Sequence, residues 1–306
     1  MANLAFVFPG QGSQYPGMGK KLYEQYPQAR GLLNQAAEVM GNNFLDILFE
    51  GPEETLKQTV YTQPAIFAVS YAQYEILKDH GVMPQVVAGH SVGEYTALAV
   101  SGVFTFAQAM QLVKTRAEVM HNAGLQYPGK MVAVIGLSEM DLKAICRQAT
   151  ENDRVVIANY NSPQQLVISG EASGVEKAEA MAKEKGAKMV IPLPVSAAFH
   201  SPLMKEAAKD FTQLLESNQF QAPRFPVAMN VDGAYHTDPG EIKKLLKLQI
   251  ESPVLWQDII LNMVNNGIEN IVEVGPGKVL TGLIKRIAPG VKAQNAQMPE
   301  ILAGIS

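Results

Sequence analysis

The strongest local signal in this chain lies in Val86-Val87-Ala88-Gly89-His90-Ser91-Val92-Gly93-Glu94. It reads as a short buried strand (Gln85–Gly89), then the pattern G-x-S-x-G, then the start of a helix (Glu94–Val100). Between a strand and a helix this pattern predicts a nucleophile elbow, a tight turn that lifts the serine clear of a sheet. The same pattern occurs by chance in ordinary turns, but the strand and helix on either side favour the elbow.

Strands and helices alternate on both sides of this turn. An apolar strand is predicted at Leu4–Phe8, and later strands near Val227–Asn230 and at Asn270–Val274. Helices are predicted between them, including one opened by a capping box at Thr105–Gln108. This alternation predicts an α/β fold with a mostly parallel sheet and helices on both faces.

The segment from Gly124 to Pro194 changes character. Its predicted order is strand, helix, strand, strand, helix, strand, which is that of a ferredoxin-like unit. We therefore expect an inserted ferredoxin-like (βαββαβ) small domain at residues 126–195. Residues 1–125 and 196–306 then form a large α/β-hydrolase-like domain around the elbow.

Composition limits the possible functions of the 306-residue chain. It is 47% hydrophobic and 18% charged, which excludes an intrinsically disordered protein. The 25 Lys and Arg against 29 Asp and Glu argue against a nucleic-acid binder. Cys146 is the only cysteine, so no intramolecular disulfide can form. No stretch has the length of a membrane span and no signal peptide is expected, so we expect a cytoplasmic protein and take a monomer as the default.

A serine nucleophile needs a base, and histidine is the usual one. His200 follows the point where the small domain returns to the large one, and a domain seam is a common place for a site. It is the best candidate by elimination, because His90 lies inside the elbow and points away from Ser91. The remaining histidines read as surface residues: His80, His121 and His236.

Arg116 is the most informative charged residue. The helix that begins after Thr105 has an apolar stripe, and Arg116 lies at its edge, one turn from Leu112 and Met120. An arginine there either extends to water along its apolar stem or pairs with a carboxylate. Its position alone favours the extension to water.

Further motifs lie along the chain in a fixed order: Phe8-Pro9-Gly10-Gln11-Gly12-Ser13-Gln14, Thr62-Gln63-Pro64-Ala65, Gly89-His90-Ser91-Val92-Gly93-Glu94-Tyr95, Arg116, Asn159-Tyr160-Asn161-Ser162-Pro163, Phe199-His200-Ser201, Gln249 and Glu273-Val274-Gly275-Pro276-Gly277. Together they resemble the malonyl-CoA:acyl carrier protein transacylases of fatty-acid synthesis and the acyltransferase domains of polyketide synthases. The resemblance extends over essentially the whole chain.

The resemblance implies a role for each matching residue. Ser91 is the nucleophile, His200 the base, and Gln249 orients His200 through a carbonyl oxygen, which makes a dyad with a neutral partner. The main-chain N–H groups of Gln11 and Val92 form the oxyanion hole. The guanidinium of Arg116 holds the malonyl carboxylate. The resemblance therefore favours pairing with a carboxylate over an Arg116 side chain that extends to water. The site is lined by Gln63 and Asn161.

The resemblance also implies a ping-pong reaction. Malonyl-CoA acylates Ser91, and the phosphopantetheine thiol of an acyl carrier protein then takes the malonyl group, with no metal or other cofactor. Phe199 resembles the residue found in malonyl-selective members, and beside the carboxylate pocket its bulk leaves no room for an extra methyl group.

Three alternatives remain at this stage. A thioester hydrolase of the same fold is disfavoured by Arg116, which such relatives lack. An α/β-hydrolase esterase needs an acid between Ser91 and His200, where the ferredoxin-like unit occupies most of the chain. A non-catalytic docking module has no need of Ser91, His200 and Arg116. The pathway, fatty-acid or polyketide, and the docking surface for the carrier protein stay open.

Overall fold

The structure is a computed structural model that describes residues 3–150, 154–195 and 197–296. Its larger sheet has the strand order β10 (Lys292–Asn295), β9 (Asn270–Glu273), β1 (Leu4–Phe8), β2 (Val86–Gly89), β7 (Val227–Ala228), β8 (Tyr235–His236). Every neighbouring pair is parallel except the antiparallel pair β7 and β8. The mostly parallel sheet predicted from the sequence is confirmed.

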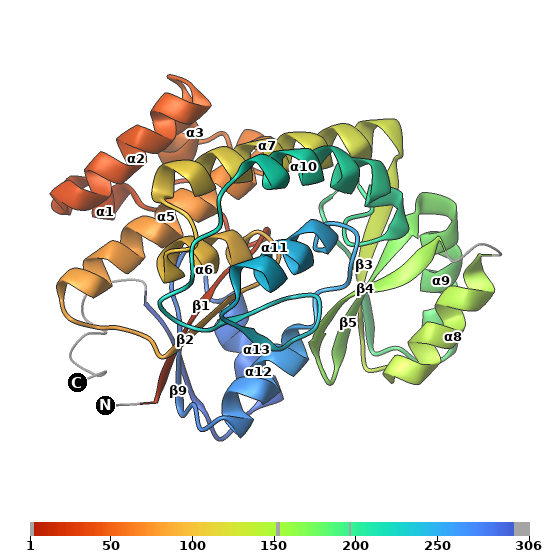
Figure 1. Ribbon diagram of the computed structural model, residues 1–306. Coiled ribbons are helices and arrows are strands. Elements are labelled where there is room, and N and C mark those ends of the chain that lie inside the picture. The colour runs from red at the N-terminus through yellow and green to blue at the C-terminus, as the bar shows by residue number, and fades with distance from the viewer. Residues whose placement is uncertain (1–2, 151–153, 196, 297–306) are drawn as a thin grey trace.

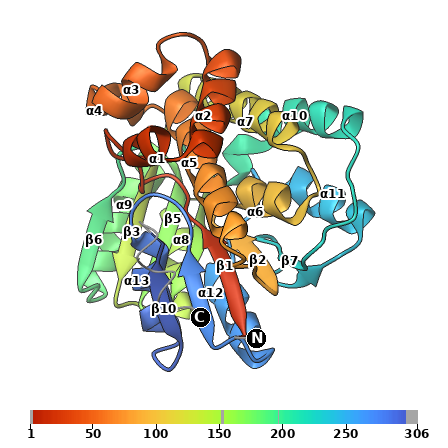
Figure 2. The same ribbon diagram turned by 90° about the vertical axis from the view of Figure 1, so that its left-hand side faces the viewer.

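Helices cover both faces of this sheet. Because side chains alternate along a strand, Phe6 of β1 faces one core and Val7 the other. The first core contains α5 (Thr59–Asp79), α6 (Gly93–Ser101) and α7 (Phe106–Gln126). The second contains α12 (Trp256–Asn265) and α13 (Val279–Ile287). Figure 2 shows α5 and α6 on the opposite side of the sheet from α13.

The small antiparallel sheet forms a separate layer at one end of the molecule (Figure 1). Its order is β4 (Val155–Ser162), β5 (Gln165–Glu171), β3 (Gly129–Ile135), β6 (Met189–Pro192). Two helices, α8 (Glu139–Ala149) and α9 (Ala172–Glu184), pack on it around their own apolar core. The N–H of Tyr160 donates to the carbonyl of Val254 at 2.9 Å, which ties β4 to the larger part of the chain.

The remaining helices complete the first core. Four of them precede α5 and were not predicted: α1 (Lys20–Gln25), α2 (Pro27–Met40), α3 (Phe44–Glu50) and α4 (Glu53–Leu56). The others follow the small sheet: η1 (Pro202–Met204), α10 (Lys205–Ser217) and α11 (Pro239–Leu248). In the part of the chain that the structure describes, no helix is both long and apolar enough to cross a membrane.

Several predicted boundaries are wrong. The sequence predicts a helix from about Ala65 to His80, but α5 begins at Thr59 and contains Pro64, because Thr62 and Gln63 in its first turns are also buried. The sequence also predicts a turn at Asn161–Pro163, but β4 continues to Ser162 and the turn comes later. Strand β10 was missed because its sequence, KAQN, has no apolar run. The predicted domain boundary at Ser196, like residues 297–306, lies outside the described residues.

The elbow packs directly on strand β1. A Cβ atom on Gly93 would lie 2.1 Å from the carbonyl oxygen of Phe8, and one on Gly89 would lie 1.9 Å from the main-chain carbon of Gly93. No side chain fits at such distances. Ser91 between them has a φ of 53°, in the left-handed region. The two glycines are therefore what lets α6 begin so close to the sheet.

We expect Gly93→Ala to lower the free energy of unfolding by about 3 kcal/mol or more, because the added methyl group displaces the backbone of β1. The matched control is Gly31→Ala in α2, where a Cβ meets nothing within 4 Å. That change should raise stability by about 0.5–1 kcal/mol, the usual gain of alanine over glycine inside a helix. Urea denaturation of both variants measures the difference, and equal midpoints would contradict this account of the elbow.

Candidate active site

Ser91 stands at the turn between β2 and α6 with its hydroxyl against an imidazole. The distance from Ser91 Oγ to His200 Nε2 is 2.7 Å, a hydrogen bond between residues 109 positions apart. The main-chain N–H of Ser91 donates to Asn230 Oδ1 at 2.8 Å. Because Asn230 follows β7, the carboxyl ends of two neighbouring parallel strands meet at this serine.

His200 is buried and held from behind by main-chain carbonyls. Its Nδ1 lies 3.0 Å from the carbonyl oxygen of Gln249 and 3.1 Å from that of Ser252. Both are acceptors, so Nδ1 carries the proton and Nε2 is free to accept one from Ser91. Burial, with a smaller effect of the Arg116 guanidinium, lowers the pKa of His200 to about 3. The ring is therefore a neutral base at physiological pH.

Arg116 is fully buried, with a relative exposure of 0%. The position of Arg116 on α7 favoured a side chain that extends to water, and this expectation is wrong. Helix α7 packs against α5 on one side and against α10 on another, so the edge of its apolar stripe is also covered. Its Nη1 donates to Gln63 Oε1 at 2.7 Å, and its Nη2 donates to Ser91 Oγ at 3.1 Å. The guanidinium thus reaches the hydroxyl that His200 also contacts.

Arg116 also donates two hydrogen bonds to the side-chain oxygen of Gln249. Its Nε and Nη2 lie 3.2 and 3.0 Å from Gln249 Oε1, and the guanidinium carbon lies 5.4 Å from the centre of the Tyr95 ring. Among the described residues no carboxylate forms an ion pair with it. A buried cation without an anionic partner is costly, so the arrangement suits a ligand that brings its own negative charge.

A cavity of about 250 Å³ opens in front of Ser91 and His200. Both parts of the chain contribute to its walls: Met131 and Val167 belong to the small sheet, and Gly10–Gln14 is the loop that follows β1. Its lining includes Gln63 and Asn161, which were predicted to line the site, and also Gln11, Val92 and Phe199. Arg116 and Gln249 lie behind its wall, in contact with Ser91.

Two main-chain donors line this cavity without a partner. In the part of the chain that the structure describes, the N–H groups of Gln11 and Val92 donate no hydrogen bond. The N–H of Val92 lies just before the first turn of α6, where the helix dipole also favours negative charge. Gln11 and Val92 both line the cavity in front of Ser91.

The other predicted residues contact the cavity in different ways. Gln63 is buried, and its Nε2 lies 3.5 Å from Met120 Sδ. Asn161 accepts a hydrogen bond at 2.8 Å from Nε2 of His90, whose ring lies against that of Trp256. Phe199 is 7% exposed and precedes His200 at the cavity wall.

Sequence reasoning missed two residues behind the elbow. Asn230 bonds the elbow from the end of β7, and the buried Glu94 carboxyl accepts from the Gln249 side chain at 2.9 Å. Glu94 could have been singled out from the sequence, because it is the only charged residue in the helix Gly93–Ser101. Asn230 had a weaker signal, since it is the polar residue that ends the short apolar run Val227–Met229. No cluster of His, Cys, Asp or Glu that could hold a metal occurs among the described residues.

Comparison with known proteins agrees with this geometry. The acyl transferase domain family matches residues 5–303. The malonyl CoA-acyl carrier protein transacylase of Bacillus subtilis (strain 168) is 41% identical over 303 residues, which cover 99% of this chain and 96% of the relative. That of Escherichia coli (strain K12) is 40% identical over 304 residues, with 99% and 98% covered.

Solved structures superpose along the full length. A crystal structure of an acyl carrier protein S-malonyltransferase from Vibrio cholerae has a TM-score of 0.95 at 41% identity and covers 100% of both chains. A malonyl-transacylase solved in complex with a type II polyketide synthase acyl-carrier protein has a TM-score of 0.96 at 37% identity, with 99% of both chains covered. The chain therefore belongs to the acyl transferase domain family and, within it, to the malonyl-CoA:acyl carrier protein transacylases.

Proposed function

We propose that this protein transfers a malonyl group from malonyl-CoA, through an ester at Ser91, to the phosphopantetheine thiol of an acyl carrier protein. The observation that carries the proposal is the convergence on one hydroxyl of a neutral base and a buried cation. Ser91 Oγ lies 2.7 Å from His200 Nε2 and 3.1 Å from Arg116 Nη2. The names of the relatives at about 40% identity point to the same reaction.

In the first half-reaction His200 Nε2 takes the Ser91 proton as Oγ attacks the thioester carbonyl. The carbonyl oxygen becomes an oxyanion, which accepts from the N–H groups of Gln11 and Val92. The carbon–sulfur bond then breaks, and the imidazolium returns its proton to the CoA thiolate. The carbonyls of Gln249 and Ser252 hold Nδ1–H throughout, so the ring keeps one orientation and one tautomer.

The second half-reaction reverses the roles. His200 takes the proton of the carrier's phosphopantetheine thiol, the thiolate attacks the malonyl ester, and Ser91 leaves as an alkoxide that His200 reprotonates. Neither half-reaction requires a metal or redox cofactor. Water competes with the thiol for the ester, and the cavity between the two sheets limits its access.

Arg116 supplies the selectivity for the acyl group. A malonyl group differs from an acetyl group by its carboxylate, and a guanidinium binds a carboxylate with two parallel hydrogen bonds. A hydrolase that clears acyl chains has no use for a buried cation beside its serine, and the relatives reported above are transacylases. Gln63 holds Arg116, while Asn161 and Phe199 shape the cavity for the acyl chain and its carrier arm.

The domain division follows the two sheets. We take residues 1–125 and 196–306 as the large α/β-hydrolase-like domain and residues 126–195 as a ferredoxin-like small domain. The order β3-α8-β4-β5-α9-β6 and the antiparallel arrangement β4-β5-β3-β6 support the latter. Both domains contribute to the cavity, so the insertion completes the site. The monomeric state and the cytoplasmic localisation stay predictions.

Incubation with malonyl-CoA should add one malonyl group to the protein, and Ser91→Ala should abolish the adduct. Intact-mass analysis measures it, and peptide mapping places it. A subsequent incubation with an acyl carrier protein should remove the group from the enzyme and add it to the carrier. An adduct that persists in Ser91→Ala would contradict the role of this serine.

The rate of acylation should depend little on pH between about pH 5 and pH 7, because the pKa of His200, about 3, keeps the base neutral over this range. Single-turnover acylation at saturating malonyl-CoA measures the rate. A tenfold fall per pH unit below about pH 6.5 would show instead that His200 titrates at its ordinary pKa.

Arg116→Ala should depress kcat/KM for malonyl-CoA by roughly 30-fold to several thousand-fold, the cost of truncating one member of a buried charge pair. Transfer of acetyl should be unchanged or improved, because acetyl has no carboxylate. Arg116→Lys should keep part of the activity, since one ammonium group cannot form two parallel bonds. The matched control is Lys114→Ala on the same helix, whose ammonium bonds the carbonyl of Val39 and should affect neither substrate. An equal fall for both substrates would make Arg116 structural.

A further inference from the structure

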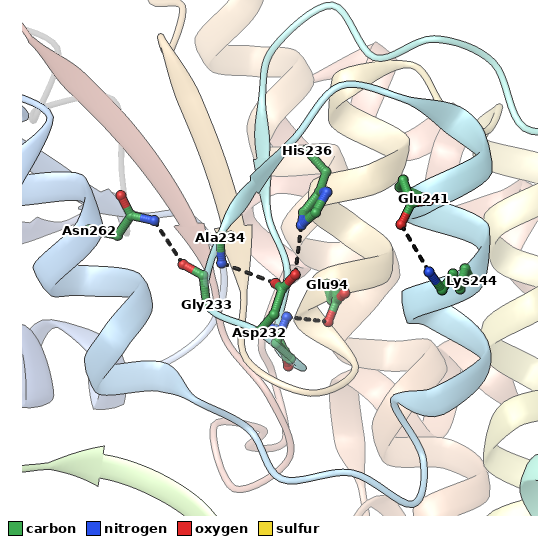
Figure 3. Close-up of polar contacts among 9 residues, drawn as sticks. Glu94, Asp232, Gly233, Ala234, His236, Glu241, Lys244 and Asn262 are labelled. Carbon is green, nitrogen blue, oxygen red and sulfur yellow. Dashed lines mark hydrogen bonds and ion pairs between the residues drawn. The ribbon is translucent and has the colours of Figure 1, made fainter.

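A buried carboxyl group lies directly behind the elbow and has no part in the proposed reaction. Glu94, in the first turn of α6, has a relative exposure of 0%. Its Oε2 accepts from Gln249 Nε2 at 2.9 Å and from the main-chain N–H of Asn230 at 3.3 Å. Figure 3 shows Glu94 facing the turn between β7 and β8, where Asp232 bonds Ala234 and His236.

The contacts of Gln249 allow only one orientation of its side-chain amide. Its Oε1 accepts from Nε and Nη2 of Arg116, which can only donate. Its Nε2 donates to Glu94 Oε2 and to the carbonyl oxygen of Ser91 at 2.9 Å. A reversed amide would set NH₂ against the guanidinium and an oxygen against two acceptors. Glu94 is therefore one of the two acceptors that keep an oxygen directed at Arg116.

The protonation state of the Glu94 carboxyl group suits a hydrogen-bond acceptor for the Gln249 amide. Burial raises the pKa of Glu94 to about 8, against smaller opposing effects of the hydrogen bonds from Gln249 and Asn230 and of the Arg116 charge, and with a small reinforcing effect of Asp232. Its Oε1 has no hydrogen-bond partner among the described residues, so the acid proton belongs on Oε1 and Oε2 is a carbonyl-like acceptor. A neutral Glu94 also leaves the charge of Arg116 uncompensated and available to an anionic ligand.

We propose that Glu94 is a positioning residue that fixes the Gln249 amide, and through it the Arg116 guanidinium, in the orientation that favours malonyl over acetyl. It acts as a hydrogen-bond acceptor at a set distance and does not act as a charge. The inference rests on the proposed function, because it concerns which acyl group that site accepts.

Two conservative variants of Glu94 separate the effect of the acceptor's distance from Gln249 from the effect of a charge on the carboxyl group. Glu94→Gln keeps an oxygen at the position of Oε2 and removes the carboxyl, so the ratio of kcat/KM for malonyl-CoA to that for acetyl-CoA should stay within about threefold of wild type. Glu94→Asp keeps the carboxyl and withdraws it by about 1.5 Å, one bond length. It should lower the ratio about 5- to 100-fold, the usual effect of a buried donor left without its partner. The fall should come mainly from a higher KM for malonyl-CoA.

Thr96→Val is the matched control on the same helix. Thr96 is buried and its Oγ1 has no partner in the described part of the chain, so the ratio should not change. A lower ratio in Glu94→Gln with a normal one in Glu94→Asp would overturn the proposal in favour of a charge effect. An equal loss for both substrates in both variants would make Glu94 merely structural. Failure of the proposed function is a separate outcome, because wild type itself would then transfer no malonyl group.

Discussion

The central physical constraint in this structure is a guanidinium buried without a carboxylate partner among the described residues. Transferring a cation from water to a protein interior is expensive, and neutral hydrogen-bond acceptors recover only part of the cost. Arg116 is held by the amides of Gln63 and Gln249, the hydroxyl of Ser91 and the ring of Tyr95. These neutral groups fix its geometry and leave its charge uncompensated, so an acyl group with a carboxylate gains an attraction that an acetyl group cannot.

The same constraint explains why the base is oriented by carbonyl groups instead of an acid. A carboxylate behind His200 would lie near Arg116, pair with it, and compete with the carboxylate of the acyl group. Gln249 avoids this conflict because its main-chain carbonyl holds His200 Nδ1 while its side-chain oxygen holds Arg116. Glu94, the carboxyl group bonded to the Gln249 side chain, has its pKa raised by burial to about 8. In the proposed function, Gln249 thus joins the base to the binding site for the acyl carboxylate.

Local patterns in the sequence predicted the elbow, the mostly parallel sheet and most helices, because these depend on neighbouring residues. The environment of Arg116 depends on residues far from it along the chain: Gln63 of α5 is 53 residues away, and Gln249, which follows α11, is 133 residues away. Helical periodicity gave only its angular position on α7, so its burial could not be predicted. Asn230 and Glu94 were missed for the same reason, since their partners lie more than 130 residues away. The resemblance to a known family supplied the roles that spacing alone could not.

A structure of the protein acylated by malonyl-CoA would test this account most directly. We expect the malonyl carboxylate to accept hydrogen bonds from two nitrogens of Arg116, and the ester carbonyl oxygen to lie within hydrogen-bond distance of the N–H groups of Gln11 and Val92. The carboxylate should also displace at least one of the neutral partners that now occupy the guanidinium. A malonyl group with its carboxylate in solvent, and an Arg116 that keeps all its present contacts, would contradict the central claim.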